Sequence, residues 1–354
     1  MRCAMNDETR WWSSCGSLGA STRALLLCAA VNCAPVAAAE GDPAFDVGGL
    51  VFGDLYHVPS HHSEAGDGAT GLVIRRGYLT FNAALGENWF GRLRFEINQS
   101  GEFETYDFDT KTKDLFLGRK FGRHKVLLGL SSTPSYDVIE AAWGMRYLAR
   151  TPMDIQGVPS RDTGLLVQGP LNAAGSLRYR AMYAPPINFG GDSNDRERWM
   201  GALGWQPATG WTLDLYADYE ALDGPHDRST LQGFVAFQAG RGRWGLQYSN
   251  QDRQDDPPIE LASVFAVYRL SEHHSLVGRV DRLLEPSAKG DGISYLPMDP
   301  SARAFMYFAA VEFRLNPHLA VTPNAVITAY DRNDQGVRPQ TDVNLRLTLF
   351  FDFE

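Results

Sequence analysis

Residues 343–353 read Val343-Asn344-Leu345-Arg346-Leu347-Thr348-Leu349-Phe350-Phe351-Asp352-Phe353, so apolar and polar side chains alternate almost without a break. Successive side chains of a β-strand point to opposite faces, which predicts a strand with one apolar and one polar face. Phe350 is the one apolar residue on the polar side. Such a strand either covers the core of a soluble sheet or meets lipid on its apolar side while its polar side lines a lumen.

The first 39 residues have the order of an export signal. Arg23 precedes the apolar run 24–31, and Ala37-Ala38-Ala39 supplies the small residues of a cleavage site. We therefore expect a cleaved signal peptide at residues 1–39, with a later start codon as an alternative, and a mature chain of residues 40–354.

The mature chain would contain no cysteine and would be acidic. All four cysteines precede the expected cleavage site, and the remaining residues carry 30 Lys and Arg against 40 Asp and Glu. An exported protein without disulfides needs a large core or a closed hydrogen-bonded barrel for its stability. The acidic balance argues against nucleic acid as a partner, for which a basic face is expected.

Alternating segments recur along the mature chain, with clear examples beginning at Trp89, Leu177, Trp199, Trp211, Phe305 and Leu319. Period-two alternation repeated this often predicts strands, although the segments near 163–171 and 259–270 are poorly phased. Seven short periplasmic turns alternate with eight longer external polar loops, near residues 57–70, 99–112, 132–162, 185–196, 221–229, 251–258, 284–301 and 331–340. This pattern predicts an all-β protein, a transmembrane antiparallel β-barrel of about 16 strands in the bacterial outer membrane.

Aromatic residues lie where the expected strands meet the short turns: Trp89, Phe121, Trp205, Trp211, Trp244, Phe313 and Phe353. They share the phase of the apolar face. We therefore interpret them as an aromatic girdle at a lipid–water boundary, rather than as residues of a soluble core.

The longest loop, 132–162, has a helical pattern. Pro134 and Pro152 flank a segment from Tyr136 to Leu148 that can form about three helical turns. On this helix Ile139, Trp143, Arg146 and Arg150 would form one stripe. A loop of this length is uncommon unless it has a function, so we expect it to fold inward and narrow the lumen.

The motifs of this region are Ser131-Ser132-Thr133-Pro134-Ser135-Tyr136, Trp143-Gly144-Met145-Arg146-Tyr147, Arg150-Thr151-Pro152-Met153-Asp154-Ile155-Gln156-Gly157 and Ser160-Arg161-Asp162-Thr163-Gly164-Leu165. Together they resemble the constriction region of porins related to the phosphate-selective porin O and P family. The resemblance implies a sixteen-stranded barrel, usually a homotrimer, that passes small hydrophilic solutes passively. It implies phosphate selectivity only weakly. The terminal strand also resembles the assembly signal of outer-membrane proteins, which implies the barrel assembly machinery as a partner.

Strand phase predicts a set of charged side chains on the lumen face: Arg76, Arg92, Arg94, Arg178, Arg180, Arg198, Arg279 and Arg346, opposed by Glu96, Asp214, Asp218, Asp281 and Asp352. Fixed charges in a narrow aqueous channel set its ion preference. We expect an anion-favouring constriction made of Arg92, Arg94, Arg178, Arg180, Arg146, Arg150 and Arg161, to which Trp143 and Asp154 also belong.

We expect no metal, cofactor or catalytic site. The pairs His61-His62 and His273-His274 have no third ligand at a defined spacing, and histidines in loops are usually exposed. The leading hypothesis is an outer-membrane porin, embedded in lipid, for small hydrophilic solutes that include anions such as phosphate. A barrel enzyme of the lipase or protease type and a soluble periplasmic β-protein are the alternatives.

Overall fold

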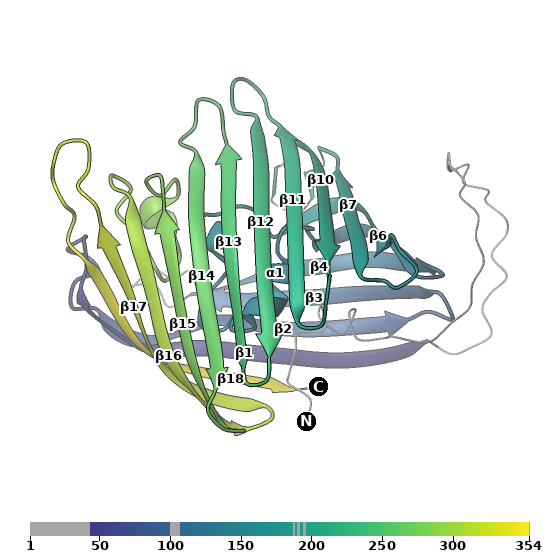
Figure 1. Ribbon diagram of the computed structural model, residues 1–354, viewed down its shortest axis with the longest axis horizontal. Coiled ribbons are helices and arrows are strands. Elements are labelled where there is room, and N and C mark those ends of the chain that lie inside the picture. Colours follow the sequence, from purple (N-terminus) through teal and green to yellow (C-terminus); the bar gives the residue numbers. More distant parts are fainter. Residues whose placement is uncertain (1–42, 100–106, 187, 190–191, 194–195, 354) are drawn as a thin grey trace.

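The computed structural model describes residues 43–99, 107–186, 188–189, 192–193 and 196–353. Sixteen strands close into one antiparallel barrel, in which β1 pairs with both β2 and β18 (Figure 1). The predicted fold class and the predicted number of barrel strands are therefore confirmed. The expected signal peptide lies outside the described residues.

In chain order the barrel strands are β1 (Ala44–Ser60), β2 (Thr70–Ala84), β3 (Trp89–Gln99), β4 (Phe108–Phe121), β5 (His124–Ser132), β6 (Arg161–Pro170), β7 (Leu177–Ala184), β10 (Glu197–Trp205), β11 (Trp211–Ala221), β12 (Arg228–Ala239), β13 (Gly242–Asp252), β14 (Ile259–Arg269), β15 (His274–Leu283), β16 (Ala304–Asn316), β17 (Leu319–Tyr330) and β18 (Asp342–Phe353). A separate two-stranded sheet, β8 (Asn188–Phe189) with β9 (Asp192–Ser193), lies in the connection between β7 and β10. The helical elements are α1 (Asp137–Trp143), α2 (Pro152–Ile155) and the 3-10 turn η2 (Gly290–Gly292).

Short turns and long loops alternate between the barrel strands, as predicted. Gly122 and Gly210 lie in two of the short turns with φ angles of 59° and 83°, a backbone region that glycine adopts without a steric penalty. The two poorly phased segments form β6 and β14. Within the described residues, no helix combines the length and the apolar character needed to cross a membrane.

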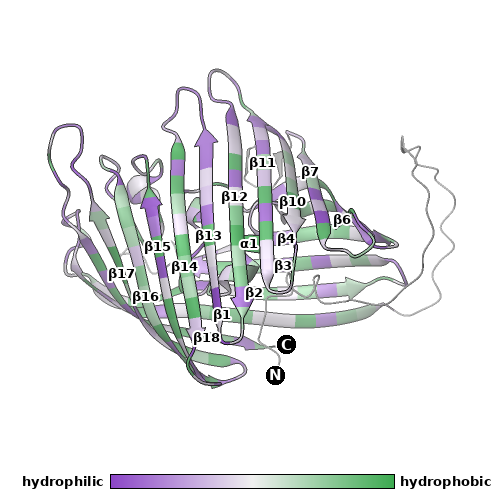
Figure 2. Ribbon diagram, in the orientation of Figure 1, coloured by the Kyte–Doolittle hydropathy of each residue, from purple (hydrophilic) through white to green (hydrophobic). Residues whose placement is uncertain are grey.

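The outer face of the barrel is apolar. Leu231 of β12 is 62% exposed and Leu246 of β13 is 50% exposed, and apolar and polar residues alternate along the strands in Figure 2. Six aromatic residues of the predicted girdle are exposed on this face: Phe121, Trp205, Trp211, Trp244, Phe313 and Phe353. Soluble monomers rarely expose apolar surface on this scale, so the outer face suits hydrocarbon rather than water.

Two β-bulges turn additional charged side chains inward. The register between β1 and β2 shifts beside Arg75, and the register between β3 and β4 shifts beside Lys113. A bulge places one extra residue against its neighbouring strand, so two consecutive residues can share a face. Arg75 and Arg76 thus both enter the interior, as do Lys113 and Asp114, with side chains at most 17% exposed.

The loop between β5 and β6 folds inward, but it contains two short helices instead of one helix of three turns. α1 ends because Gly144 adopts a φ of 62° and donates its N–H to the carbonyl of Glu140, a helix ending that glycine favours. α2 begins at Pro152, whose fixed φ suits the first turn of a helix. The predicted helix therefore forms only in its first part, as α1, and the chain from Gly144 to Leu148 is not helical.

The predicted helical stripe is wrong for the same reason. Ile139 and Trp143 lie on α1, whereas Arg146 and Arg150 follow it in non-helical chain. The two apolar residues are buried. The two arginines instead reach a common partner, Asp154 of α2.

An apolar cluster joins this inward loop to the barrel wall. It contains Ile139, Trp143 and Tyr147 of the loop with Phe52, Phe234, Phe265 and Phe350 of four different strands. The rings of Trp143 and Phe265 meet edge to face with centroids 5.2 Å apart. The wall is thus apolar on its inner side where the loop covers it, which explains the exceptional position of Phe350 in the terminal strand.

The connection between β15 and β16 also folds inward. It contains η2 and buries Ile293 and Met298 in a cluster with Ile155 of the first inward loop. Ser287 donates a hydrogen bond of 2.7 Å to the side-chain oxygen of Gln156. The long loop predicted at 284–301 is present, but it folds inward because apolar residues in its middle are buried against the first loop.

Candidate functional site in the lumen

The first inward loop carries a group of ion pairs on its own residues. Arg146 Nε lies 3.2 Å from Glu140, and Arg146 Nη2 lies 3.3 Å from Asp154. Arg150 Nη1 approaches the same Asp154 carboxylate at 3.7 Å and donates a hydrogen bond to its backbone carbonyl. Asp154 therefore holds together the helix α2 and the chain that follows α1.

Burial and ion pairing act in opposite directions on these groups. Burial alone would raise the pKa of Asp154, but Arg150 and Arg146 hold this pKa below its usual range. Burial alone would lower the pKa of Arg146, whereas Asp154 and Glu140 raise it. Both groups are therefore charged at neutral pH, and the loop keeps its fixed charges.

On the wall beside the loop, the buried carboxylate of Glu96 is shared by three cations. Arg76 of β2 lies 3.4 Å from it, and Lys111 and Lys113 of β4 lie 3.1 Å and 3.0 Å from it. Lys111 faces Glu96 directly across the β3–β4 ladder. The bulge in β4 brings Lys113 to the second carboxylate oxygen, so one acid holds three positive charges.

Asp114 of β4 holds two arginines. Arg161, the first residue of β6, lies 2.6 Å from its carboxylate, and Arg94 of β3 lies 3.2 Å from it. Arg94 also donates a hydrogen bond to the hydroxyl of Thr80 and lies over the ring of Tyr78. These contacts fix both arginines on the inner side of the wall.

Asp54 of β1 holds two further arginines beside the β1–β18 junction. Arg75 lies 2.6 Å from its carboxylate and Arg346 lies 3.7 Å from it. The hydroxyl of Thr348 donates a hydrogen bond of 2.6 Å to the same group. Arg75 also donates to the backbone carbonyl of Leu148 at 3.3 Å, which ties this part of the wall to the inward loop.

These ion pairs leave an excess of positive charge on one side of the lumen. Among the described residues they bring nine cations, Arg75, Arg76, Arg94, Lys111, Lys113, Arg146, Arg150, Arg161 and Arg346, to five carboxylates, Asp54, Glu96, Asp114, Glu140 and Asp154. Further along the wall, from β7 to β15, three buried arginines are matched by acids: Arg180 by Asp214, Arg279 by Asp281, and Arg198 by Asp218, with Asp162 3.9 Å away. Fixed charge of one sign beside an aqueous channel raises the local concentration of the opposite ion.

The predicted arginine cluster divides into two neighbouring groups. Arg94, Arg146, Arg150 and Arg161 belong to the ion pairs described above. The remaining three, Arg92, Arg178 and Arg180, line a pocket of about 70 Å³ in the wall. We call it the basic pocket, and its cationic lining residues are Arg92, Arg123, Lys125, Arg178 and Arg180. Asp114 lines the same pocket and thereby connects the two groups.

Trp143 is buried between the loop and the wall rather than exposed to the lumen. It is 1% exposed, and its indole N–H donates a hydrogen bond of 2.9 Å to the carbonyl of Ala149. The guanidinium of Arg279 lies over its ring, 5.2 Å from the centroid. Its contacts therefore anchor the loop, whereas Asp154, the other predicted non-arginine residue, pairs with cations of the site.

Sequence reasoning missed Arg75, Lys111 and Lys113. In uninterrupted alternation Arg75 and Lys113 would face lipid, and Lys111 falls in a segment that was assigned to a loop. A usable signal does exist in the sequence. Arg75-Arg76 and Lys113-Asp114 are consecutive charged residues inside strands, and one member of each pair would meet lipid unless a bulge turned it inward.

The structure also corrects the interpretation of the first histidine pair. His61 is 6% exposed, and the two ring nitrogens of His62 lie 2.9 Å from Asp342 and 2.8 Å from Asp291. The expectation that His61 and His62 are exposed is therefore wrong. The second pair is exposed, as expected, with His273 in a short turn and His274 at the start of β15.

Comparison with known proteins defines the class of the barrel. No protein-family model and no curated protein matches the sequence. Among solved structures, the anion-selective porin from Comamonas acidovorans is 14% identical and matches 88% of this chain and 100% of its own, with a TM-score of 0.63. Salmonella typhi OmpF, solved in complex with daunomycin, is 13% identical over 87% of this chain and 97% of its own, with a TM-score of 0.64. The trimer form of OmpT, an outer membrane protein of Vibrio cholerae, is 13% identical over 88% and 99%, with a TM-score of 0.58.

At these identities the likeness concerns the fold. The chain is a closed sixteen-stranded antiparallel barrel, and the solved anion-selective porin and OmpF share this fold.

Proposed function

We propose that the protein is an outer-membrane porin, a water-filled channel for the passive diffusion of small hydrophilic solutes. The closed barrel, its apolar outer face and its charged interior support this function, since these are the features of a membrane pore. The likeness to solved porins supports it further. We also propose that the chain is exported through a cleaved signal peptide and inserted into the outer membrane by the barrel assembly machinery.

The pore prefers anions, and phosphate is among the solutes that it passes. The main support for this proposal is that nine cations meet only five carboxylates on the inward loop and the adjacent wall. Charges in loops at the surface are screened within about 10 Å at 0.1 M salt, whereas charges inside the barrel lie close to a passing ion. The acidic balance of the whole chain therefore does not set the preference.

The test is the zero-current potential of single barrels in a planar bilayer under a KCl gradient. A Lys111→Gln, Lys113→Gln double variant removes two of the three cations around Glu96 and should shift this potential toward cations. The matched control is Arg332→Gln with Arg338→Gln, which removes the same charge from two exposed residues of the β17–β18 loop. A wild-type pore that prefers cations, or equal shifts in both double variants, would contradict the proposal. The phosphate-to-chloride permeability ratio, measured in the same bilayer, tests the solute.

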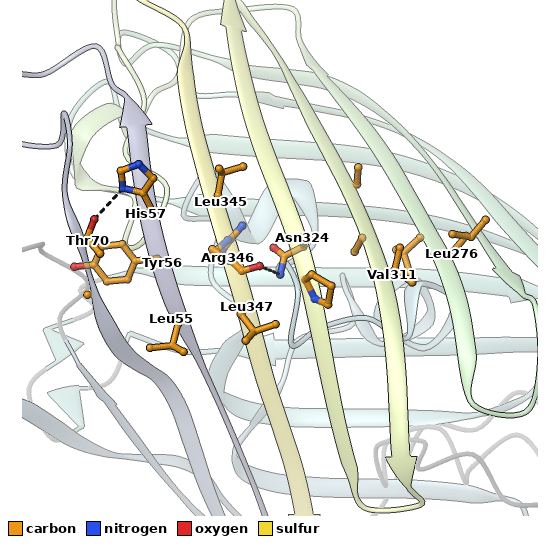
Figure 3. A pocket seen from close by; sticks show the side chains of 15 residues that line it. Leu55, Tyr56, His57, Thr70, Leu276, Val311, Asn324, Leu345, Arg346 and Leu347 are labelled. Carbon is orange, nitrogen blue, oxygen red and sulfur yellow. Dashed lines mark hydrogen bonds between the residues drawn. The ribbon is translucent and has the colours of Figure 1, made fainter.

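We infer further that three barrels assemble as a homotrimer. A groove of about 830 Å³ lies on the outer wall. Figure 3 shows Leu55, Leu345, Leu347, Val311 and Leu276 among its lining residues. It spans strands from both ends of the chain and offers an apolar surface to a neighbouring barrel. Native mass spectrometry in detergent should give three times the mass of the mature chain, and a monomer mass would contradict the inference. Leu55→Ala with Leu347→Ala should lower the temperature at which the trimer dissociates, whereas Leu231→Ala on β12 should not.

The proposal contains no catalytic step. A purified barrel that hydrolyses lipid or peptide, and that loses this activity on replacement of one serine or histidine of the rim, would favour the barrel enzyme. Heat-dependent migration on a detergent gel separates a membrane barrel from a soluble periplasmic β-protein.

A further inference from the structure

We propose that His61, His62 and Asp342 bind a divalent transition-metal ion such as Zn²⁺ at the long-loop end of the barrel. His61 and His62 begin the loop that follows β1, and Asp342 is the first residue of β18. Each offers one ligand atom, and these three atoms lie within 4.8 Å of one another. Two imidazole nitrogens and one carboxylate oxygen are a donor set that suits zinc and its neighbours in the first transition row.

The spacing of the ligand atoms is close to that of a metal site. Zinc binds nitrogen and oxygen at about 2.0–2.2 Å, so two ligand atoms of a tetrahedral site stand about 3.4 Å apart. His62 Nδ1 already lies 2.9 Å and 3.0 Å from the two carboxylate oxygens of Asp342. The site therefore closes on a metal through a small movement of His61 toward the other two residues.

The groups behind the ligands match those of natural metal sites. A histidine that binds a metal through one ring nitrogen usually donates the other N–H to a carboxylate or a backbone carbonyl. His62 has Asp291 2.8 Å from Nε2, which leaves Nδ1 for the metal. His61 Nδ1 lies 3.2 Å from the carbonyl and 3.0 Å from the backbone nitrogen of Ser63, so Nε2 is the ring nitrogen that would bind the metal. The hydroxyl of Tyr330 donates a hydrogen bond to Asp342 and orients the third ligand.

The surrounding loop holds the first histidine in a fixed position. The His61 backbone N–H donates to Asp67 at 3.1 Å, and Gly66 packs directly on the imidazole. A Cβ atom at Gly66 would lie 2.5 Å from His61 Nδ1, so the chain can approach the ring this closely because residue 66 is glycine. The buried ring is thus part of a packed local structure rather than of a surface tail.

Metal binding would replace the direct contact between His62 and Asp342 with a cation that also engages His61. The ion would join the end of β1 to the start of β18. Through Asp291, which belongs to η2, it would also fix the second inward loop. The consequence is a metal-dependent link between the barrel rim and a segment that fills part of the lumen.

The experiment is isothermal titration of the purified, chelator-treated barrel with Zn²⁺, accompanied by visible absorption spectra after addition of Co²⁺. We expect one Zn²⁺ per barrel and a Co²⁺ spectrum of low coordination number with nitrogen ligands. His61→Gln and His62→Gln should each weaken Zn²⁺ binding at least tenfold. Asp291→Asn, which removes only the carboxylate behind His62, should weaken it by a smaller factor.

The matched control is His273→Gln with His274→Gln, which alters the exposed second pair and should leave the affinity unchanged. Heat-dependent gel migration establishes that each variant is folded. A wild-type barrel that binds Zn²⁺ no more tightly than a folded His61→Gln, His62→Gln double variant would overturn the proposal. The Co²⁺ spectrum tests the wild type alone, so a spectrum of fully hydrated Co²⁺ would overturn it without any variant.

Discussion

Tyr147 and Phe350 stack with ring centroids 4.9 Å apart and an interplanar angle of 33°, which joins the first inward loop to the last strand of the barrel. The hydroxyl of Tyr147 also donates a hydrogen bond of 2.8 Å to Glu312 of β16. One loop residue is therefore held by two strands of the wall. The position of the loop depends on such contacts, because its helices are too short to be stable by themselves.

Phe350→Ala should loosen the inward loop without preventing insertion of the barrel. Removal of a buried phenylalanine ring costs about 3–5 kcal/mol, and here the loss falls on the contact between loop and wall. We expect larger open-channel current noise and a lower temperature of heat-dependent gel migration. Phe351→Ala is the control, because Phe351 is 44% exposed on the outer face. Equal noise in both variants would show that the aromatic stack does not hold the loop.

Deletion of residues 135–159 should raise the conductance and weaken the ion selectivity together. The segment fills part of the interior and supplies Arg146 and Arg150 to the excess of positive charge. The deletion also leaves Phe52, Phe265 and other inner residues facing water, so we expect a less stable barrel. Single-channel recording of correctly folded barrels gives both quantities. An unchanged conductance would place the conduction path away from this loop.

Leu246→Arg should impair insertion of the barrel into membranes. Leu246 is 50% exposed and lies near the middle of β13, where an arginine on the lipid face costs about 2–4 kcal/mol. The control is Gln335→Arg, which adds the same side chain at an exposed position of the β17–β18 loop. The measurement is the fraction of heat-modifiable barrel recovered from lipid vesicles. Equal recovery of both variants would mean that Leu246 does not contact lipid.

Asp154→Asn should strengthen the preference for anions. It removes one of the five carboxylates and leaves Arg146 and Arg150 without their common partner. Loss of one member of a buried ion pair destabilises the structure by about 3–5 kcal/mol, so the loop should also become more mobile. The zero-current potential gives the selectivity, and Asp334→Asn in the exposed β17–β18 loop is the control. A shift toward cations would contradict the assigned sign of the local charge.

Met298→Ala should mobilise the second inward loop. Met298 is fully buried between this loop and the first one, and truncation of such a side chain costs about 2–5 kcal/mol. We expect faster hydrogen exchange of the backbone amides at 290–298 and additional conductance substates. Val337→Ala, at a 56% exposed position of the neighbouring loop, should change neither. Unchanged hydrogen exchange in Met298→Ala would show that burial of Met298 does not hold this loop in the channel.

The strands were predictable from the sequence because the two faces of a barrel wall meet two different solvents. Alternation as clear as that of Leu345, Arg346 and Leu347 leaves little freedom in the assignment of faces. The assignment of inner and outer faces from alternation failed in β14, where the apolar residues Ile259, Leu261 and Phe265 lie on the inner side. These residues are covered by an inward loop. Alternation between a lipid face and a water face cannot predict such a contact.

The charged site in the lumen was harder to predict from the sequence, since it depends on β-bulges and on contacts between residues far apart in the chain. A bulge shifts which face Arg75 and Lys113 occupy, although the composition of their strands remains unchanged. Asp342 lies 280 residues from His62, and barrel closure brings the two together. The end of the loop helix was not predicted, because the apolar and charged stripe continues past Gly144, whereas the left-handed backbone of this glycine ends α1.

The junction between β1 and β18 couples closure of the barrel to the position of the first inward loop. The first inward loop packs on Phe52 of β1 and on Phe350 of β18, and Asp54 of β1 accepts a hydrogen bond from Thr348 of β18. The two strands that close the wall are therefore also two of the strands that hold the loop. Any change that loosens the closing seam should loosen the narrowing of the channel as well.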